Sequence, residues 1–371
     1  MKFKIKYLDL ERQYKLIDKE LNIKIKKIFK NSSFILRDEV KIFEKTICKL
    51  LNVKYCVGLN SGTDALLMAM SQLNLKKNDE VITVSHTYIA SVSAIVHVGA
   101  KPIYVDIQED FNIDHSLIEK KINKKTKAIL IVHLNGRCCQ MDKITAISKK
   151  YKIPIIEDCA QSLGSKFKNK FSGTFGLAGA FSLHPMKSLS VPGDGGFLVT
   201  NNQRVYKNIS LLRDHGRERK KNKKDSRKCF GFNSRLDNLH ASIALVKLKK
   251  FKKWINLRRK IAKTYCNNLK KIKDLILPHY DGANFYDTFN SFVIKVNKRD
   301  KLRSYLLNNG IEVFSHIDKG IHLEKFSPPG SGLKKTEKIE KKILSLPIYP
   351  ELKNKEIMYV TNKIIEFYEK N

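Results

Sequence analysis

The chain has 371 residues, of which 42% are hydrophobic and 29% charged, a composition typical of a soluble globular protein long enough for a large domain and a smaller one. Lysine and arginine number 72 against 36 acidic residues, so the formal net charge is +36. Apolar runs are too short to span a membrane, and the N-terminal segment lacks the apolar core of a secretory signal. We therefore expect a cytoplasmic protein without a membrane partner.

The positive charge must be weighed as a nucleic-acid signal. The basic residues are mostly lysines scattered along the whole chain, whereas proteins that read nucleic acids favour arginine and gather their charge on one face or tail. The longest basic patch, at residues 217–228, is typical of a solvated loop. We predict no nucleic-acid partner, and a basic regulatory or nucleic-acid-binding protein stays as an alternative. Long-range attraction would still favour anionic small molecules.

The seven cysteines form no CxxC pair and show no paired metal spacing. An odd number of cysteines without such pairs is typical of free thiols in a reducing compartment. The ten histidines contain no HExxH or other metal-binding spacing. The sequence therefore predicts no bound metal.

Strands and helices are predicted to alternate over the first two hundred residues. Strands are expected at residues 54–59, 80–84, 101–107, 127–134, 153–158, 179–183 and 196–200. Helical apolar spacing is found at residues 63–73, 88–99 and 141–151. Strands that are apolar on both faces and alternate with helices indicate an α/β fold, with a mainly parallel sheet covered on both sides.

The pattern changes from about residue 233. One long helical stretch is predicted at residues 236–269. It is followed by a strand at 290–296, a helix at 299–310, a strand at 311–317 and a final helix at 354–371. These elements predict a smaller α+β unit, joined to the large domain by the long helix.

Residues 60–63 (NSGT) lie between a predicted strand and a predicted helix. Ligands of open parallel sheets bind at the carboxyl ends of the strands, and a helix N-terminus there attracts an anion such as phosphate. Gly62 would let the backbone come close to the anion, and the hydroxyl of Thr63 would add a donor. The same sequence also serves as a helix cap without any ligand, so both interpretations stay open.

Two charged residues are placed as reactive groups often are. Asp158 ends the apolar strand IPIIED, where a buried carboxylate needs a cationic partner. A protonated pyridine nitrogen or a structural arginine would serve, and capping of the next segment is an equally good interpretation. Lys187 lies between an apolar run and the glycine-rich PGDGG turn. Desolvation there would favour the neutral amine, which can form a Schiff base.

Several segments match the motifs of one known family in the family's own order. They are YLDLERQY, SFILRDEVKIFEK, NSGTDALLMAM, EVITVSHTYIASVSAI, IIEDCAQSLGS, FSLHPMKSL, DGGFLVTNN, LRDHG and GFNSRLDNLHASIAL. Over nearly its whole length the chain resembles the DegT/DnrJ/EryC1/StrS family of aminotransferases, which depend on pyridoxal 5'-phosphate (PLP) and act on nucleotide-linked sugars. The resemblance implies a type I aminotransferase-like α/β fold. A large cofactor-binding domain (residues 1–250), with a mainly parallel seven-stranded sheet between helices, would precede a smaller C-terminal α+β domain (251–371).

The resemblance also implies roles for individual residues around the PLP ring. Lys187 would form a Schiff base with the cofactor and then move the proton between cofactor and substrate. Asp158 would pair with the pyridinium nitrogen, so that the ring accepts electrons. Gln161 would lie near the phenolic oxygen, and Tyr88 would stack on the face of the ring.

Four residues are implied at the cofactor's phosphate. Gly62, Thr63 and Ser182 would hold it from the same chain. Asn233, in GFNSRL, would reach the phosphate in the neighbouring subunit, which implies a homodimer with shared active sites.

The chain departs from the family's pattern at several positions, with Leu183 and Met186 in the lysine motif, EDCAQ in place of EDAAQ, and two further segments. The loop usually written YGxPADM reads NGRCCQM at residues 135–141. Near the C-terminus, the common HYPxPxH appears as HIDKGIH, which keeps His316 and His322 but has Ile317 in place of tyrosine. Both histidines are expected to lie near the substrate, so the identity of the sugar stays open.

The activity implied by the resemblance is transfer of an amino group to a keto-deoxysugar carried on a nucleoside diphosphate. The donor would be L-glutamate, and the product an amino sugar for a surface glycan. A sugar dehydratase of the same family is the main alternative. Such dehydratases have histidine at the lysine position, so Lys187 favours the aminotransferase.

Overall fold

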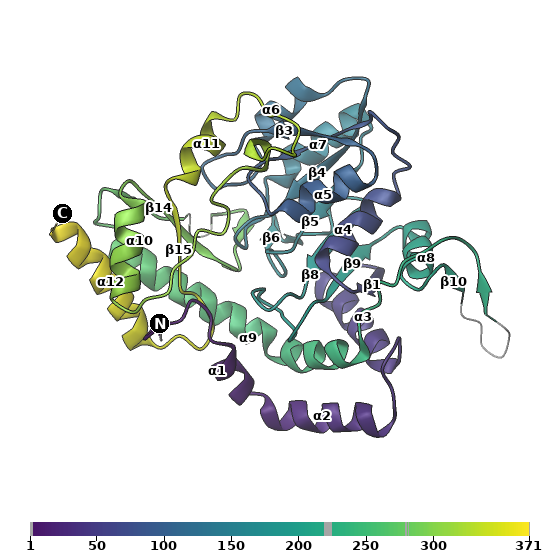
Figure 1. Ribbon diagram of the computed structural model, residues 1–371, viewed down its shortest axis with the longest axis horizontal. Helices are drawn as coiled ribbons and strands as arrows, with labels where there is room; N and C mark the ends of the chain where they lie inside the picture. Colours follow the sequence, from purple (N-terminus) through teal and green to yellow (C-terminus); the bar gives the residue numbers. More distant parts are fainter. Residues whose placement is uncertain (1–2, 219–224, 279, 281, 371) are drawn as a thin grey trace.

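The computed structural model describes residues 3–218, 225–278, 280 and 282–370 (Figure 1). A large sheet with its helices lies on the right of Figure 1, and a smaller unit lies on the left. The long helix α9 (Asn238–Leu269) runs beneath both. Among the helices of these residues, none is both long and apolar enough to cross a bilayer. All seven cysteines are free thiols.

The central sheet has seven strands in the order β1-β9-β8-β5-β4-β2-β3. Strand β9 runs antiparallel to its neighbours β1 and β8, and the other neighbouring strands are parallel. The strands are β1 (Tyr55–Leu59), β2 (Glu80–Val84), β3 (Lys101–Val105), β4 (Thr126–Val132), β5 (Ile155–Asp158), β8 (Ala178–Ser182) and β9 (Gly196–Thr200). The predicted α/β fold with a mainly parallel seven-stranded sheet is confirmed.

Helices cover both faces of this sheet because alternate side chains of its strands are apolar on both sides. In β4, Ala128 and Leu130 pack in the core that contains α4, α5 and α8. Ile129 and Ile131, which point the other way, pack in the core that contains α7. These helices are α4 (Gly62–Ser71), α5 (Ile89–His97), α7 (Met141–Tyr151) and α8 (Gln203–Leu212).

Three N-terminal helices lie outside the predicted elements. They are α1 (Leu10–Lys15), α2 (Asp18–Lys30) and α3 (Asp38–Leu51). Helix α3 buries Val40, Phe43, Ile47 and Leu51, at the three- and four-residue spacing of one helix face. This face packs on the β1-β9-β8 part of the sheet together with the first half of α9.

The smaller unit has its own core, called here the C-terminal core. It is built around an antiparallel sheet of β12 (Leu275–Ile276), β14 (Phe292–Val296) and β15 (Ile343–Leu346). The second half of α9 packs in this core with α10 (Arg299–Asn308) and α12 (Asn354–Glu369). Helix α9 thus crosses the predicted boundary at residue 250 without a break, and that boundary stays a prediction.

The strand predicted at residues 311–317 is absent. Ile311 forms an isolated bridge with Ile5, and Phe314 forms another with Ser345. Because this segment pairs at single points with two different parts of the chain, no continuous ladder develops. The shorter elements of the fold are α6 (His115–Ile118), η1 (Glu119–Lys121), β6 (Lys166–Phe167), β7 (Lys170–Phe171), β10 (Arg217–Glu218), β11 (Ser226–Arg227), β13 (Phe285–Tyr286), η2 (Ile321–Leu323) and α11 (Lys334–Glu340).

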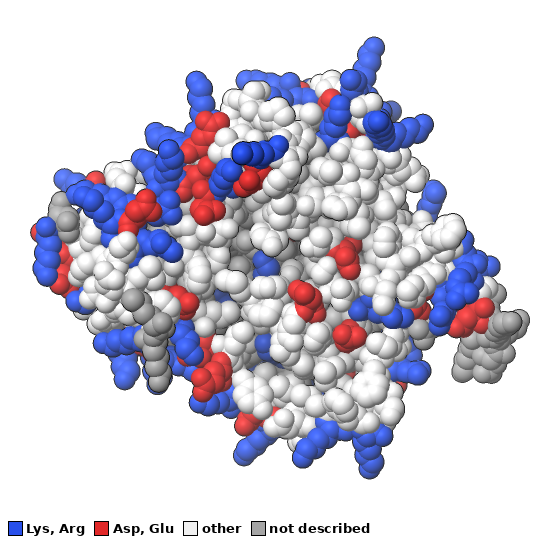
Figure 2. Space-filling model, viewed as in Figure 1, with Lys and Arg blue, Asp and Glu red and all other residues white. Residues whose placement is uncertain are grey.

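The charged side chains on the face shown in Figure 2 lie mostly around its margin. Lysines and arginines alternate there with acidic residues, and nearer the centre a few mostly acidic side chains stand apart on an otherwise white surface. On this face, therefore, the basic side chains do not form the continuous patch or groove with which proteins bind nucleic acids.

Candidate active site

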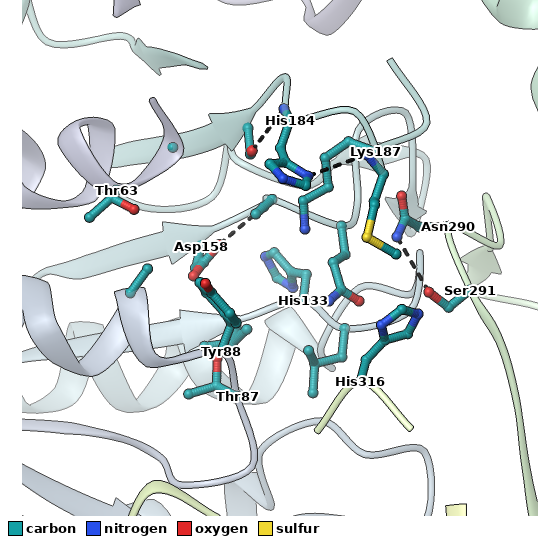
Figure 3. A pocket seen from close by; sticks show the side chains of 18 of the residues that line it. Thr63, Thr87, Tyr88, His133, Asp158, His184, Lys187, Asn290, Ser291 and His316 are labelled. Atoms are coloured by element: carbon teal, nitrogen blue, oxygen red, sulfur yellow. Dashed lines mark hydrogen bonds between the residues drawn. The ribbon is translucent and has the colours of Figure 1, made fainter. Parts of the chain in front are cut away.

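A cavity of about 380 Å³ opens at the carboxyl ends of the parallel strands, between the large sheet and the C-terminal core. Its wall includes residues from both units, some of which are shown in Figure 3. The structure brings together eight of the predicted site residues in this wall. They are Gly62, Thr63, Tyr88, Asp158, Gln161, Ser182, Lys187 and His316.

The start of α4 forms a close-packed backbone turn on one side of the cavity. Strand pairing places Leu59, Gly196 and Ser182 side by side, so the turn after β1 lies directly against the end of β8. A Cβ atom at Gly62 would lie 2.8 Å from the Cβ of Ser182, and only glycine fits there without a shift.

The first two residues of α4 precede its internal hydrogen bonds. Ala65 N–H bonds to the carbonyl of Ser61 at 3.1 Å, and Asp64 N–H bonds to the Ser61 hydroxyl at 3.0 Å. The amides of Gly62 and Thr63 come before these donors, where a helix has no internal acceptor to offer. This end of α4 is therefore suited to an anion such as phosphate.

Asp158 is a buried carboxylate that accepts hydrogen bonds from neutral donors. Its Oδ2 accepts a hydrogen bond from the Ser91 hydroxyl at 2.6 Å, and its Oδ1 accepts one from the Ala160 N–H at 3.0 Å. In the part of the chain that the structure describes, no lysine, arginine or histidine forms an ion pair with it. The structural arginine considered above is therefore absent from these residues, and a cationic ring nitrogen in the cavity would supply the missing charge.

Lys187 lies in the connection between β8 and β9 and lines the same cavity (Figure 3). Burial lowers the pKa of this lysine below its ordinary value, and the nearby carboxylate of Asp158 opposes the change. No ion-pair partner of Lys187 occurs among the described residues. An amine in this setting is neutral more often than a surface lysine, as a nucleophile must be.

Two histidines in the cavity wall also feel this environment. Burial and, secondarily, the charge of Lys187 lower the pKa of His316 to about 4. Burial and Lys187 also lower the pKa of His184. The Nε2 of His316 lies 2.7 Å from the hydroxyl of Tyr7, which comes from the N-terminal segment. Both imidazoles are therefore neutral hydrogen-bonding groups at pH 7.

The other predicted site residues differ in their placement. The Oε1 of Gln161 accepts a hydrogen bond from the Asn135 N–H at 2.9 Å, and Tyr88 lines the cavity with 66% of its surface exposed. Asn233 is exposed and does not line the cavity of its own chain. His322 is buried outside the wall, with its Nδ1 2.6 Å from the Ser85 hydroxyl, so its expected place at the substrate gains no support.

A buried pair at the cavity wall, to which His133 contributes, was missed in the sequence. His133 accepts a hydrogen bond from the Cys139 N–H at its Nδ1, so its Nε2 carries the proton and donates to Glu157 at 2.9 Å. The backbone N–H groups of residues 173, 175 and 176 also donate to Glu157. Although the ligand atoms of His133, Glu157 and Cys159 lie within 4.8 Å of one another, these hydrogen bonds account for the histidine and the carboxylate without an ion.

Other wall residues were also missed. A polar residue at the end of an apolar strand, as in KAILIVH, is the signal that could have identified His133. The wall residues Tyr7, His184, Asn290 and Ser291 occur in segments without such a pattern. The contribution of Tyr7, Asn290 and Ser291 depends on how the N-terminal segment and the C-terminal core fold against the sheet, whereas His184 comes from the connection between β8 and β9.

Comparison with known proteins places these features in a family. The sequence pattern of the DegT/DnrJ/EryC1/StrS aminotransferase family matches residues 15–365. A Geobacillus stearothermophilus protein named "Pleiotropic regulatory protein" is 36% identical over 97% of this chain and 98% of its own length. A Streptomyces venezuelae protein named "dTDP-3-amino-3,4,6-trideoxy-alpha-D-glucose transaminase" is 32% identical over 99% of this chain and 97% of its own.

Solved structures agree with this placement. S. venezuelae DesV, in complex with a ketimine intermediate, superposes with a TM-score of 0.93 at 32% identity, over 98% of both chains. NtdA from Bacillus subtilis, with bound cofactor PMP, superposes with a TM-score of 0.86 at 29% identity, over 95% of this chain and 82% of its own. The chain belongs to the DegT/DnrJ/EryC1/StrS aminotransferase family.

Proposed function

We propose that this chain is a PLP-dependent aminotransferase that moves an amino group from L-glutamate to a keto-deoxysugar carried on a nucleoside diphosphate. The product would be an amino sugar for a surface glycan. One observation carries the proposal: Lys187, Asp158 and the first residues of α4 line the same cavity. Family membership and the names of the transaminase relatives support it.

The residues present fit PLP in charge and shape. When bound, PLP supplies an aldehyde that reacts with amines and a ring that accepts electrons. The α4 turn, with Gly62, Thr63 and Ser182, would bind the phosphate. Asp158, held by Ser91, would face the ring nitrogen and favour its protonated form.

Lys187 provides the reactive amine. Its lowered pKa increases the fraction of neutral nitrogen that can attack the aldehyde, and the same nitrogen can later accept and return a proton. Tyr88 would cover one face of the ring, and Gln161 would lie beside its oxygen. His184 and His316, neutral at pH 7, would donate or accept hydrogen bonds with sugar hydroxyls, and the positive charge of the chain would attract the diphosphate.

The active form is proposed to be a homodimer in the cytoplasm. Asn233 is exposed and lies outside the cavity of its own chain, which supports a role at the neighbouring site. The free thiols support a reducing compartment. Mixing Lys187→Ala and Asn233→Ala subunits tests the shared site. Such a mixed dimer has one site with both residues intact, so it should recover activity that neither parent shows.

The activity is tested with purified protein, PLP, glutamate and a panel of keto-sugar nucleotides. Products are identified by mass and NMR. The expected result is a visible absorption band that Lys187→Ala abolishes, together with an aminated sugar nucleotide. A colourless protein that makes no aminated sugar would contradict the proposal.

The name of the Geobacillus relative gives a reason to assay DNA binding in the same preparation. A colourless protein that shifts DNA would favour the regulatory alternative. If the substrate instead loses a hydroxyl without gaining nitrogen, the dehydratase alternative is correct.

A further inference from the structure

The backbone next to Lys187 is held by a side chain from the other unit of the molecule. Asn290 lies just before β14, in the C-terminal core sheet. Its Oδ1 accepts two hydrogen bonds from Ser188, one from the backbone N–H and one from the hydroxyl, both at 3.1 Å. Because the backbone N–H can only donate, the oxygen of the Asn290 amide must be the atom that faces it.

Both residues of this contact are buried, with 8% of Asn290 and 9% of Ser188 exposed. Asn290 also lines the cavity, and its Nδ2 points toward Ser291 on the cavity side (Figure 3). One amide therefore reaches the lysine segment with its oxygen and the cavity wall with its nitrogen.

Asn290 is itself held firmly. The buried guanidinium of Arg258, on α9, donates to the carbonyls of Phe289 at 3.2 Å and Ile348 at 2.7 Å. A Cβ at Gly136 would lie 2.7 Å from the backbone nitrogen of Asn290, so the loop after β4 packs directly on the backbone of Asn290. Asn290 is thus a rigid point against which the lysine segment is set.

The lysine segment has few other restraints near its tip. Its ends are joined by the hydrogen bond from the Val191 N–H to the Leu183 carbonyl at 2.8 Å. Within the turn, the Lys187 N–H donates to the backbone carbonyl of His184. Further along, the ammonium of Lys247 donates to the Ser190 hydroxyl at 3.0 Å. On one side of Lys187, the Met186 N–H donates to the Nδ1 of His184 at 3.3 Å within the same turn. On the other side, the contact of Ser188 with Asn290 ties the segment to the other unit.

We propose that Asn290 is a positioning residue for Lys187: by holding Ser188 it fixes the direction from which the lysine's amine enters the cavity. This inference rests on the proposed function. A reacting group displaced by about 1 Å can cost roughly a hundredfold in rate. Loss of Asn290 should therefore change the rate of reaction more than the binding of substrate.

The experiment compares four variants of the PLP-loaded protein. Asn290→Ala removes the acceptor, Ser188→Ala removes one of the two hydrogen bonds, and the double variant removes both partners. The control is Asn256→Ala, an exposed asparagine on α9 whose side chain accepts a hydrogen bond from the Tyr286 hydroxyl. Activity is expressed per molecule of bound PLP, so that reduced loading is separated from reduced rate.

Asn290→Ala is expected to lower kcat about 10- to 100-fold while KM changes less than about threefold. Ser188→Ala should have a smaller effect, and the double variant should be no slower than Asn290→Ala, because both changes remove the same contact. The pH titration of the visible band, which does not depend on turnover, should shift in Asn290→Ala and stay in place in Asn256→Ala.

Asn290→Asp tests the mechanism further. The carboxylate keeps both acceptor contacts and adds a negative charge near Lys187, which favours the protonated amine. Its kcat should recover at high pH, and the pKa that describes the acid limb of its pH–rate profile should be higher than that of the wild type.

Three outcomes would overturn the role of Asn290. The first is an Asn290→Ala variant with wild-type kcat per bound PLP and an unchanged titration of the band. The second is an equal loss in Asn256→Ala. The third is an Asn290→Ala variant whose melting temperature falls while its kcat per bound PLP stays that of the wild type. If the wild-type protein shows no visible band and no transamination, the proposed function fails and this inference fails with it.

Discussion

The hydroxyl of Ser91 donates a hydrogen bond of 2.6 Å to the Asp158 carboxylate, although the two residues are 67 positions apart in the chain. The hydroxyl of Thr87 lies 2.8 Å from that of Ser91 and extends the contact into a short chain of hydroxyl groups. Helix α5 is thereby joined to the end of β5, and the carboxylate is fixed in one orientation toward the cavity.

Replacing Ser91 with alanine is therefore expected to weaken the binding of PLP. A hydrogen bond to a charged group contributes roughly 1.5 to 3 kcal/mol, so the affinity should fall about tenfold or more. Fluorescence titration of the apoprotein with PLP measures this. Ser93→Ala, two residues along α5, is the matched control and should bind PLP as the wild type does. Equal affinities for both variants would show that Ser91 does not orient the carboxylate.

Gly62→Ala tests the backbone turn at the start of α4. The added Cβ would lie 2.8 Å from that of Ser182, so the turn must move away from the end of β8. We expect PLP affinity to fall by roughly tenfold or more while the circular dichroism spectrum stays that of a folded α/β protein. The second-site change Ser182→Gly removes the clashing atom but also a group assigned to the phosphate, so in the Ser182→Gly background Gly62→Ala should cost less PLP affinity than in the wild type. An equal loss from Gly62→Ala in both backgrounds would mean that the contact does not limit the turn.

Lys187→Met should stabilise the cofactor-free protein. The folded-state pKa of this lysine is lowered from 10.5, so the unfolded chain binds a proton that the folded chain holds poorly. This difference lowers the free energy of unfolding. The penalty has its full size below the folded-state pKa and disappears as the pH rises through 10.5. The free energy of unfolding of the variant should exceed that of the wild type at pH 7.5, with a smaller gap at pH 9.5. An exposed-lysine control, Lys252→Met, should not show this change with pH.

His86 should make the fold sensitive to acid. It is 2% exposed, and burial and the charge of Lys295 lower its pKa from 6.5 to about 4, against the opposing effect of Asp106. Stability is therefore lost as the pH falls from 6.5 toward 4, because the unfolded state alone binds the proton. When the pH falls from 7.5 to 4.5, the free energy of unfolding, measured with urea, should decrease in His86→Asn by roughly 2 to 3 kcal/mol less than in the wild type. Equal losses would contradict the shift.

The sheet could be predicted because its information is local. In β4, apolar residues on both faces, Ala128 and Leu130 against Ile129 and Ile131, already specify a strand covered on both sides. The strand expected at 311–317 has four apolar residues among its seven. It failed because its partners, Ile5 and Ser345, come from distant parts of the chain and each pairs with it once.

The site shows the same division. Lys187, Asp158 and the turn at Gly62 stand out in the sequence because each breaks an apolar or regular pattern. Ser91 does not: it is one small residue within a helix, and only the packing of α5 against β5 gives it a carboxylate to bind. Asn290 likewise follows no local pattern, since its partner lies 102 residues away.

The reversed direction of β9 has a consequence for how such an enzyme can diversify. A helical crossover would carry the chain to the opposite end of the strands before the next strand begins. Residues 183–195 instead leave β8 and enter β9 at the same end of the sheet. The base of this excursion is closed by the Leu183 N–H and the Gly195 carbonyl, 2.8 Å apart. Apart from Lys187 and Ser188, whose proposed roles fix their identity, residues between these ends can be exchanged without moving a strand, so the selectivity of the proposed enzyme can change on an unaltered scaffold.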